Sequence, residues 1–276
     1  MYKLSRVGLS VRLTFISLFM LWVLMPIYWL INTSFKHNSE IISSFSSFWP
    51  THFTLSAYSY VINNLGVYFE NSIVVSLGAT IFSLIIGLLA AYSLSRFKFS
   101  KIFTSFFWFI ILAIRMMIPI VFIIPLYQIF QNLGLYNTRV GLIIAYTLVN
   151  LPFVIWMMVS FFNDVPVELE EAAMVDGASR LRAFIRIILP LGAPGIAAVS
   201  ILTIVMTWND LIFGLYLTSN TQAMTLPVGI VGFITQYKTL WAQMAAAGTL
   251  AIVPMIFVVL FVQKYLVRGL TAGAIK

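Results

Sequence analysis

Six long intervals of the chain carry almost no charge, and they constrain its fold more than any other feature. They run from Leu13 to Phe35, Asn71 to Ser95, Ile102 to Thr138, Val140 to Asn163, Ile187 to Asn209 and Thr239 to Gln263, and Arg115 is the one charge inside them. The hydrocarbon core of a bilayer needs about 20 apolar residues per helical crossing. Each interval therefore predicts one membrane span, with trimmed limits of 13–32, 72–95, 103–127, 140–162, 194–217 and 245–263.

The composition agrees with a chain whose solvent is lipid. Hydrophobic residues make up 61% of it and charged residues 9%, against about 25% charged residues in soluble domains. Backbone amides inside a bilayer must be bonded within the protein, which leaves helices or a closed barrel. Barrel strands alternate apolar and polar residues, whereas these intervals are continuous, so we expect an all-α integral membrane fold.

Lysine and arginine set the expected orientation, because positively charged flanks stay in the cytoplasm. With a cytoplasmic N-terminus the inner flanks hold twelve of them and the outer flanks three: Lys36, Arg139 and Lys238. The inner twelve are Lys3, Arg6, Arg12, Arg96, Lys98, Lys101, Arg180, Arg182, Arg186, Lys264, Arg268 and Lys276. Both termini are therefore expected inside. The expected organisation is a first span with its outer loop (1–69), a transmembrane domain (70–263) and a cytoplasmic tail (264–276).

Several function classes are disfavoured by what the sequence holds. Cysteine is absent and histidine occurs only as His37 and His52, which excludes disulfides, thiolate chemistry and a histidine-rich metal cluster. The net charge of +8 is spread over the span flanks and does not form the continuous basic stripe of a nucleic-acid binder. The first span is longer than the apolar region of a cleavable signal peptide and lacks a small-residue cleavage site, so we expect a retained anchor.

The loop at 163–193 is charged and patterned, and holds five of the eight acidic residues. Asp164 is expected to cap a helix with Pro166 in its first turn. Gly177 is expected to end that helix in a left-handed conformation. Ser179 is expected to cap a second helix that Pro190 closes. By itself such a loop is more often simply solvated.

A family pattern changes that interpretation. Glu171-Ala172-Ala173, then Gly177, Ile187 and Leu189-Pro190 at fixed spacing resemble the coupling loop of ABC import permeases. The agreement extends over about Ala57 to Lys276 and is strongest with the carbohydrate-uptake branch, the maltose-type second permeases. The further matching stretches begin at Arg115, Ile124, Trp208, Thr225 and Leu266.

The resemblance implies a type I importer fold and a set of partners. In such importers this loop docks into a cleft of a cytoplasmic ATPase, which assigns that role here to Glu170, Glu171, Ala172, Ala173, Asp176, Gly177, Ile187, Leu189 and Pro190. It also implies a second homologous permease, two ATPase subunits and an extracytoplasmic substrate-binding protein. The chain has no G-x-x-x-x-G-K-[ST] phosphate loop, so no cofactor is expected on it, and ATP and Mg are expected on the ATPase.

Polar residues within the spans mark a candidate pathway. Arg115 lies mid-span, where a charge costs at least ~2.5–3.5 kcal/mol and must face protein or water. It either lines the route and bonds sugar hydroxyls, or pairs with Asp210 or with the partner permease. Pro119 and Pro152 can each bend a helix or simply pack. The candidate lining residues are Arg115, Pro119, Asn150, Asn209 and Asp210.

The outer loop at 218–244 is the third candidate region. In maltose-type importers its counterpart contacts the substrate-binding protein, which the resemblance assigns here to Asn220, Thr221, Gln222, Gly229 and Gly232. The alternative is an ordinary connector.

The sequence predicts a transport subunit for a sugar or oligosaccharide. The same machinery could move glycerol 3-phosphate or a glycerol phosphodiester, but a phosphate needs several convergent cations and the spans hold one. A polytopic membrane enzyme would need an intramembrane constellation such as His, Ser–Lys or paired carboxylates. A secondary transporter would show inverted repeats and an ion-coupling carboxylate. Neither pattern is visible in the sequence.

Overall fold

The computed structural model describes residues 6–43 and 47–272, and the side chains of residues 12–43 and 47–260. Within those ranges the secondary structure is helical apart from one isolated bridge between Ile234 and Thr239. Lys3 and Lys276 lie outside the described residues, and the side chains of Arg6, Lys264 and Arg268 are not described.

The described residues form two compact units. The first comprises those up to Gly66 together with Ile230–Val253, and the second comprises Val67–Gly229 together with those from Pro254 on. The helices α3 (Ser56–Arg96) and α13 (Trp241–Ala272) each contribute to both units.

The first unit contains α1 (Arg6–Ser34) and α2 (Asn38–Ile42) with the opening turns of α3. Asn38 caps the start of α13, because its Oδ1 accepts the Ala242 amide at 3.0 Å and its Nδ2 donates to Gln243 at 2.9 Å. Phe35 stacks on Phe53 with ring centroids 4.7 Å apart. These contacts fold back the residues between the first two expected spans.

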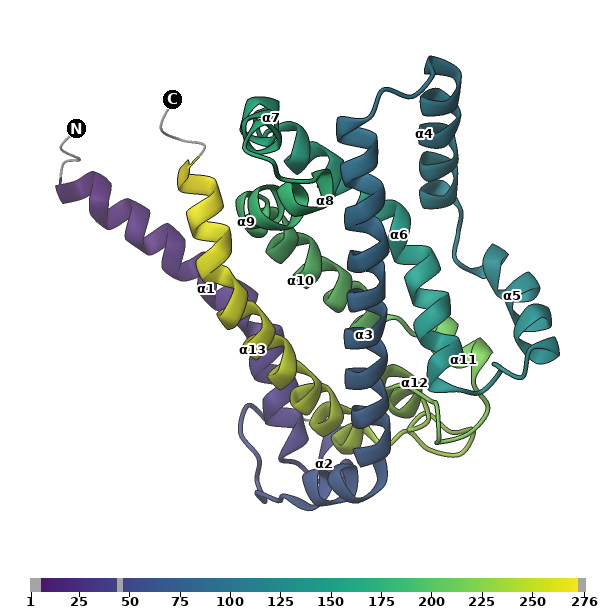
Figure 1. Cartoon of the computed structure of the whole chain (residues 1–276). Coiled ribbons are helices and arrows are strands. Elements are labelled where there is room, and N and C mark those ends of the chain that lie inside the picture. The colour runs from purple at the N-terminus through teal and green to yellow at the C-terminus, as the bar shows by residue number, and fades with distance from the viewer. Residues whose placement is uncertain (1–5, 44–46, 273–276) are drawn as a thin grey trace. The chain divides into compact units, whose positions relative to one another are not determined.

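The second unit is built on α3, α4 (Lys101–Met116), α5 (Ile120–Asn132), α6 (Arg139–Asn163) and α10 (Ala193–Asn209). Figure 1 shows them with the short helices α7, α8, α9 and α11. α6 is buried on several sides, with Phe153, Met158 and Phe162 in one apolar cluster and Leu142 and Tyr146 in another. It is therefore the central helix of this unit.

Six spans fit the structure when bent helix pairs count as single crossings. Four helices are long and apolar enough to cross a membrane, and two further pairs meet at sharp bends. α4 and α5 are bent by 98°. Pro119 lacks an amide and disfavours a helical residue before it, and the chain is extended at Met117. The interval expected as the third span, 103–127, therefore holds two helices with a sharp bend between them.

Other boundaries also differ from expectation. The second crossing was expected at 72–95, but α3 begins at Ser56, so much of the expected outer loop is helix. The fifth crossing, expected at 194–217, is interrupted at Asp210, where the backbone is extended between α10 and α11 (Ile212–Leu217). The fourth crossing agrees to within a residue, since α6 covers the expected 140–162.

Candidate functional site

The 163–193 segment consists of four short helical pieces, and a glycine turn separates the first from the other three. α7 (Val167–Val175) is followed by Gly177 at φ +85°, then α8 (Arg180–Ala183), the π-helix η1 (Phe184–Ile188) and α9 (Leu189–Leu191). The Gly177 conformation is one that L-residues rarely adopt, and the expected left-handed stop is confirmed. The Ser179 cap is also confirmed, because its hydroxyl accepts the Arg182 amide at 3.3 Å.

Two details of this segment were predicted wrongly. Asp164 does not begin α7; it follows the end of α6, and Pro166 is the residue before α7. Pro190 does not close the second helix either, because α9 continues to Leu191 and the bend of 74° follows before Ala193. Pro190 directly follows the π-helix within the continuous helical run Arg180–Leu191, and its missing amide removes one backbone hydrogen bond there.

Three side chains, which we call the Arg96 cluster (Tyr92, Arg96 and Glu170), fasten this segment to the end of α3. Arg96 Nε lies 3.0 Å from Glu170 Oε2, and Arg96 Nη2 donates to the Val165 carbonyl at 2.9 Å. The Tyr92 hydroxyl donates to the other Glu170 oxygen. The charged side chains are 4% and 3% exposed. Glu170 therefore faces the interior of the chain, and its neighbour Glu171 is exposed.

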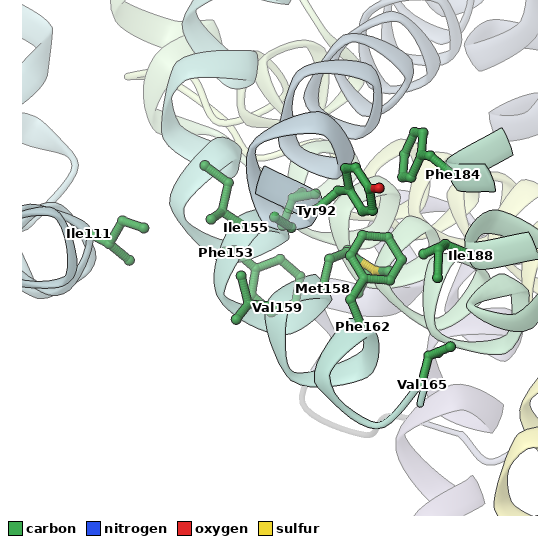
Figure 2. Packing of buried hydrophobic residues seen from close by; sticks show 13 residues of the cluster. Tyr92, Ile111, Phe153, Ile155, Met158, Val159, Phe162, Val165, Phe184 and Ile188 are labelled. Atoms are coloured by element: carbon green, nitrogen blue, oxygen red, sulfur yellow. The ribbon is translucent and has the colours of Figure 1, made fainter. Parts of the chain in front are cut away.

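An apolar cluster lies beside these polar contacts. The Tyr92 and Phe184 rings have centroids 4.6 Å apart. Phe162 and Ile188 complete the contact, as Figure 2 shows. The packing holds η1 against α3 and α6, so both halves of the 163–193 segment are anchored to helices of the second unit.

The opposite side of the segment is exposed and mixes apolar with charged side chains. Val175 is 87% exposed and Leu181 61%. Glu171, Ala172 and Asp176 are also exposed, whereas Ala173, Ile187 and Leu189 are partly buried. A surface that combines apolar side chains with charges of both signs is suited to contact with another protein.

A cavity of about 250 Å³ lies where the helices of the second unit are interrupted. It brings together four of the five predicted pathway residues: Arg115, Pro119, Asn150 and Asp210. The fifth, Asn209, is exposed outside the cavity and bonds back to the Val205 carbonyl at 2.8 Å.

The polar atoms of the cavity are held by hydrogen bonds between helices. Asn150 Nδ2 donates to Thr207 Oγ1 at 2.9 Å. Asp210 Oδ1 accepts from the Tyr146 hydroxyl and from the Phe213 amide, each at 2.9 Å. The cavity therefore presents fixed amide and carboxylate groups among apolar side chains, the usual character of a small-molecule site.

Arg115 does not pair with Asp210. Its guanidinium lies over the Phe153 and Trp156 rings, 5.0 and 5.5 Å from their centroids. In the described side chains the two ion pairs are Arg96–Glu170 and Arg139–Glu70. The Arg115 guanidinium is thus attracted to two aromatic faces and lines the cavity without an ion-pair partner among the described side chains.

The predicted outer contact residues fall into different environments. Asn220, Thr221 and Gln222 are exposed in one turn. Asn71 of α3 fixes that turn by donating to the Thr221 and Met224 carbonyls at 3.0 and 2.8 Å. Gly229 packs closely on Tyr68. Gly232 is exposed and belongs to the first unit.

Sequence reasoning missed several residues that the structure places at these sites. Tyr146 and Thr207 lie in the cavity, and Tyr146 precedes Asn150 by four positions, which puts them on one helix face. Arg96 was assigned only to membrane orientation. Its buried partner is 74 positions away, and no local signal connects them. In the described residues no group of three or more His, Asp or Glu side chains could hold a metal ion.

The fold and these sites define a polytopic helical membrane protein with a cavity among broken helices and an exposed, anchored loop. Residues 83–272 match the family described as binding-protein-dependent transport system inner membrane component. The chain belongs to this family, which makes it a multi-pass inner-membrane permease and a transport subunit rather than an enzyme, with ATP hydrolysis on a separate subunit.

Two curated relatives agree with this assignment over nearly their whole length. The diacetylchitobiose uptake system permease protein DasC of Streptomyces coelicolor is 35% identical, covering 91% of this chain and 91% of the relative. The trehalose/maltose transport system permease protein MalG of Thermococcus litoralis is 33% identical, covering 92% and 91%. The predicted membership of the carbohydrate-uptake branch of ABC permeases is confirmed.

A solved structure shows that the fold is shared. The crystal structure of a bacterial ABC transporter involved in the import of the acidic polysaccharide alginate aligns with a TM-score of 0.79. The sequence identity is 23%, and the alignment covers 96% of this chain and 99% of the other. The expected type I importer architecture is thereby confirmed.

Proposed function

We propose that this chain forms, with a second homologous permease, the membrane pathway for a sugar or oligosaccharide delivered by a substrate-binding protein. Two ATPase subunits, which carry ATP and Mg, supply the energy, and one of them docks on the 163–193 segment. The chain itself binds no nucleotide in this scheme.

One observation supports docking above all others: the 163–193 segment exposes Val175 and Leu181 on a piece of chain that is anchored from behind by buried Glu170 and Phe184. An exposed apolar surface on an otherwise ordered segment marks a protein contact. Anchoring from behind lets a force on the exposed face reach the spans instead of deforming the loop.

The cavity at Arg115, Asn150 and Asp210 supplies the proposed cargo contacts. Carbohydrates offer hydroxyl groups that donate and accept, and apolar ring faces. Carboxylate, amide and guanidinium groups bond the hydroxyls, while Phe153 and Phe213 offer apolar surface to the rings. The sugar transport systems named for the two curated relatives support the same cargo class.

Glycerol 3-phosphate or a glycerol phosphodiester is the alternative cargo. The cavity disfavours it, because the Asp210 carboxylate lines the same space as Arg115. A phosphate would meet one cation and one anion there, whereas phosphate sites gather several charge-assisted donors. A neutral sugar carries no charge for the Asp210 carboxylate to repel.

The turn of Asn220, Thr221 and Gln222 is the proposed contact for the binding protein. Gly229 packs on Tyr68 of the chain itself, and the exposed Gly232 is a separate candidate in the first unit. The turn is exposed at its tip and held at its base by Asn71. A fixed base with exposed polar side chains suits repeated contact with a soluble partner.

The test uses the tagged chain expressed with the second permease, ATPase and binding protein of its host. Glu171→Lys and Gly177→Pro should remain in the membrane but lose ATPase on purification and lose uptake. Glu70→Lys is the matched control, because it makes the same charge change in an exposed, weak pair with Arg139. Normal ATPase recovery and full uptake in both loop variants would refute the docking proposal.

A further inference from the structure

α3 connects the two proposed contact regions as one uninterrupted helix. It runs from Ser56 to Arg96, and the stretch from Asn71 to Arg96 spans about 38 Å at 1.5 Å per residue. No proline interrupts it. By contrast, α4 and α5 meet at 98°, and α10 is separated from α11 at Asp210.

The C-terminal end of this stretch contacts the 163–193 segment through two residues, Arg96 and Tyr92. Arg96 bonds α7 through Glu170, and it bonds the connection between α6 and α7 through the carbonyl of Val165, two residues before α7 begins. Tyr92, one turn earlier, bonds Glu170 and packs on Phe184 of η1. The contacts are buried and directional, so they define one relative position, whereas apolar packing alone would allow sliding.

The N-terminal end of this stretch is hydrogen-bonded to the turn that contains Asn220, Thr221 and Gln222. Asn71, fully buried, donates to two carbonyls of that turn. The neighbouring Ser72 hydroxyl accepts the Leu226 amide at 2.7 Å. Both ends of the stretch are thus fixed by buried hydrogen bonds to chain segments far away in sequence.

We propose that α3 is a rigid rod that couples the ATPase-facing segment to the binding-protein-facing turn within this subunit. Displacement of the 163–193 segment moves α3 through the Arg96 cluster, and α3 moves the turn through Asn71 and Ser72. Tyr92, Arg96 and Glu170 act here as positioning residues and do not touch the ATPase. The inference rests on the proposed function, since it needs partners at both regions.

Coupling between two binding sites is reciprocal. Nucleotide on the ATPase should change the affinity for the binding protein by the same factor by which the binding protein changes the affinity for nucleotide. The coupling can therefore be measured from the binding-protein side. The complete transporter in lipid nanodiscs is titrated with its binding protein, with and without a non-hydrolysable ATP analogue. The readout is the ratio of the two affinities, which a merely structural residue would leave unchanged in a folded complex.

Arg96→Lys tests one end and Ser72→Ala the other. Lysine keeps the charge but cannot bond Glu170 and the Val165 carbonyl together, because it lacks the planar fork. Each variant should assemble and bind both partners, while the affinity ratio falls by about tenfold, within the usual range of coupling between sites. Tyr92→Phe keeps the ring on Phe184 and should lower the ratio in the same direction; it also serves if Arg96→Lys does not assemble.

Ser93→Ala is the matched control on the same helix, since its hydroxyl bonds only back to the Leu89 carbonyl in the described structure. It should keep the wild-type ratio. The proposal would be refuted if the assembled Arg96→Lys and Ser72→Ala variants kept the wild-type affinity ratio. It would also be refuted if Ser93→Ala lowered that ratio as much as they do. If the wild-type chain recruits no ATPase, the proposed transport function is refuted. That result differs from an assembled transporter whose affinity ratio is unchanged by the variants, which refutes only the role of α3.

Discussion

Asn150 of α6 and Thr207 of α10 are joined by a hydrogen bond of 2.9 Å between two buried side chains, at the wall of the cavity. The bond lies two residues from Pro152, where the helix loses a backbone bond. It therefore ties two helices together at the position where one of them is weakest.

Replacement of Asn150 by Leu should destabilise the protein by ~1–3 kcal/mol, because the Thr207 hydroxyl is left buried without this partner. Thermal unfolding of the purified protein in detergent measures the change. The double variant Asn150→Leu/Thr207→Val should recover part of the loss, since both polar groups are then gone. Strictly additive losses would contradict a direct energetic link between the two side chains.

Gly177→Ala should destabilise by ~1–2 kcal/mol, because a Cβ is disfavoured at φ +85° although the space around it is open. Gly66→Ala is the matched control. It also has open space, but lies within α3, and alanine there should be neutral or should stabilise by up to ~1 kcal/mol. The same thermal measurement on both variants separates backbone conformation from crowding; equal shifts would rule out the conformational argument.

Arg115→Ala should reduce uptake about tenfold or more, because a hydrogen bond to a charged group is worth ~1.5–3 kcal/mol. Arg115→Lys should retain part of the activity through its charge and its contact with the Phe153 and Trp156 rings. Radiolabelled sugar uptake into cells is the measurement, with the amount of assembled complex checked in parallel. Arg139→Ala, which breaks a partly exposed pair, should transport normally; wild-type uptake by Arg115→Ala would remove it from the pathway.

The loop before α3 should loosen in acid through Glu40. The backbone amide of Thr51, with help from the Ser47 hydroxyl, holds the pKa of the Glu40 carboxyl below its ordinary value of 4.5. A lowered folded-state pKa means that the stabilisation is complete above the ordinary value and is lost as the pH falls through the lowered one. The hydrogen-exchange protection factor of the Thr51 amide should therefore fall below about pH 4.5. Glu40→Gln should show no such transition, and a pH-independent wild type would refute the assignment.

Much of the fold was predictable because membrane crossing imposes a simple rule on hydrophobicity. α6 matches its interval closely, since both ends are marked by a cap and by polar residues. The start of α3 at Ser56 was not predictable from hydropathy, because the first turns are rich in Ser, Tyr and Asn and belong to a different compact unit. Pro119 indicated a bend in the third crossing but not its 98° size, which depends on what α5 packs against.

Those parts of the site that depend on a local sequence motif were predictable. Those that depend on contacts between residues distant in sequence were not. The Gly177 turn and the Ser179 cap follow from short-range backbone chemistry. The burial of Glu170 beneath Arg96 depends on a pairing across 74 positions. Of two adjacent glutamates, Glu170 turns inward and Glu171 outward, a distinction that the motif alone does not contain.

The π-helix at Phe184–Ile188 affects which changes of chain length the 163–193 segment can tolerate. A π turn closes its hydrogen bond one residue later than an α turn, so it absorbs one residue without lengthening the path. Deletion of Ile185 lets the turn revert to α, whereas a deletion in α7 rotates the side chains that follow it in that helix by about 100°. The segment therefore contains one place where evolution can change chain length by a single residue while Leu189 and Pro190 keep their direction.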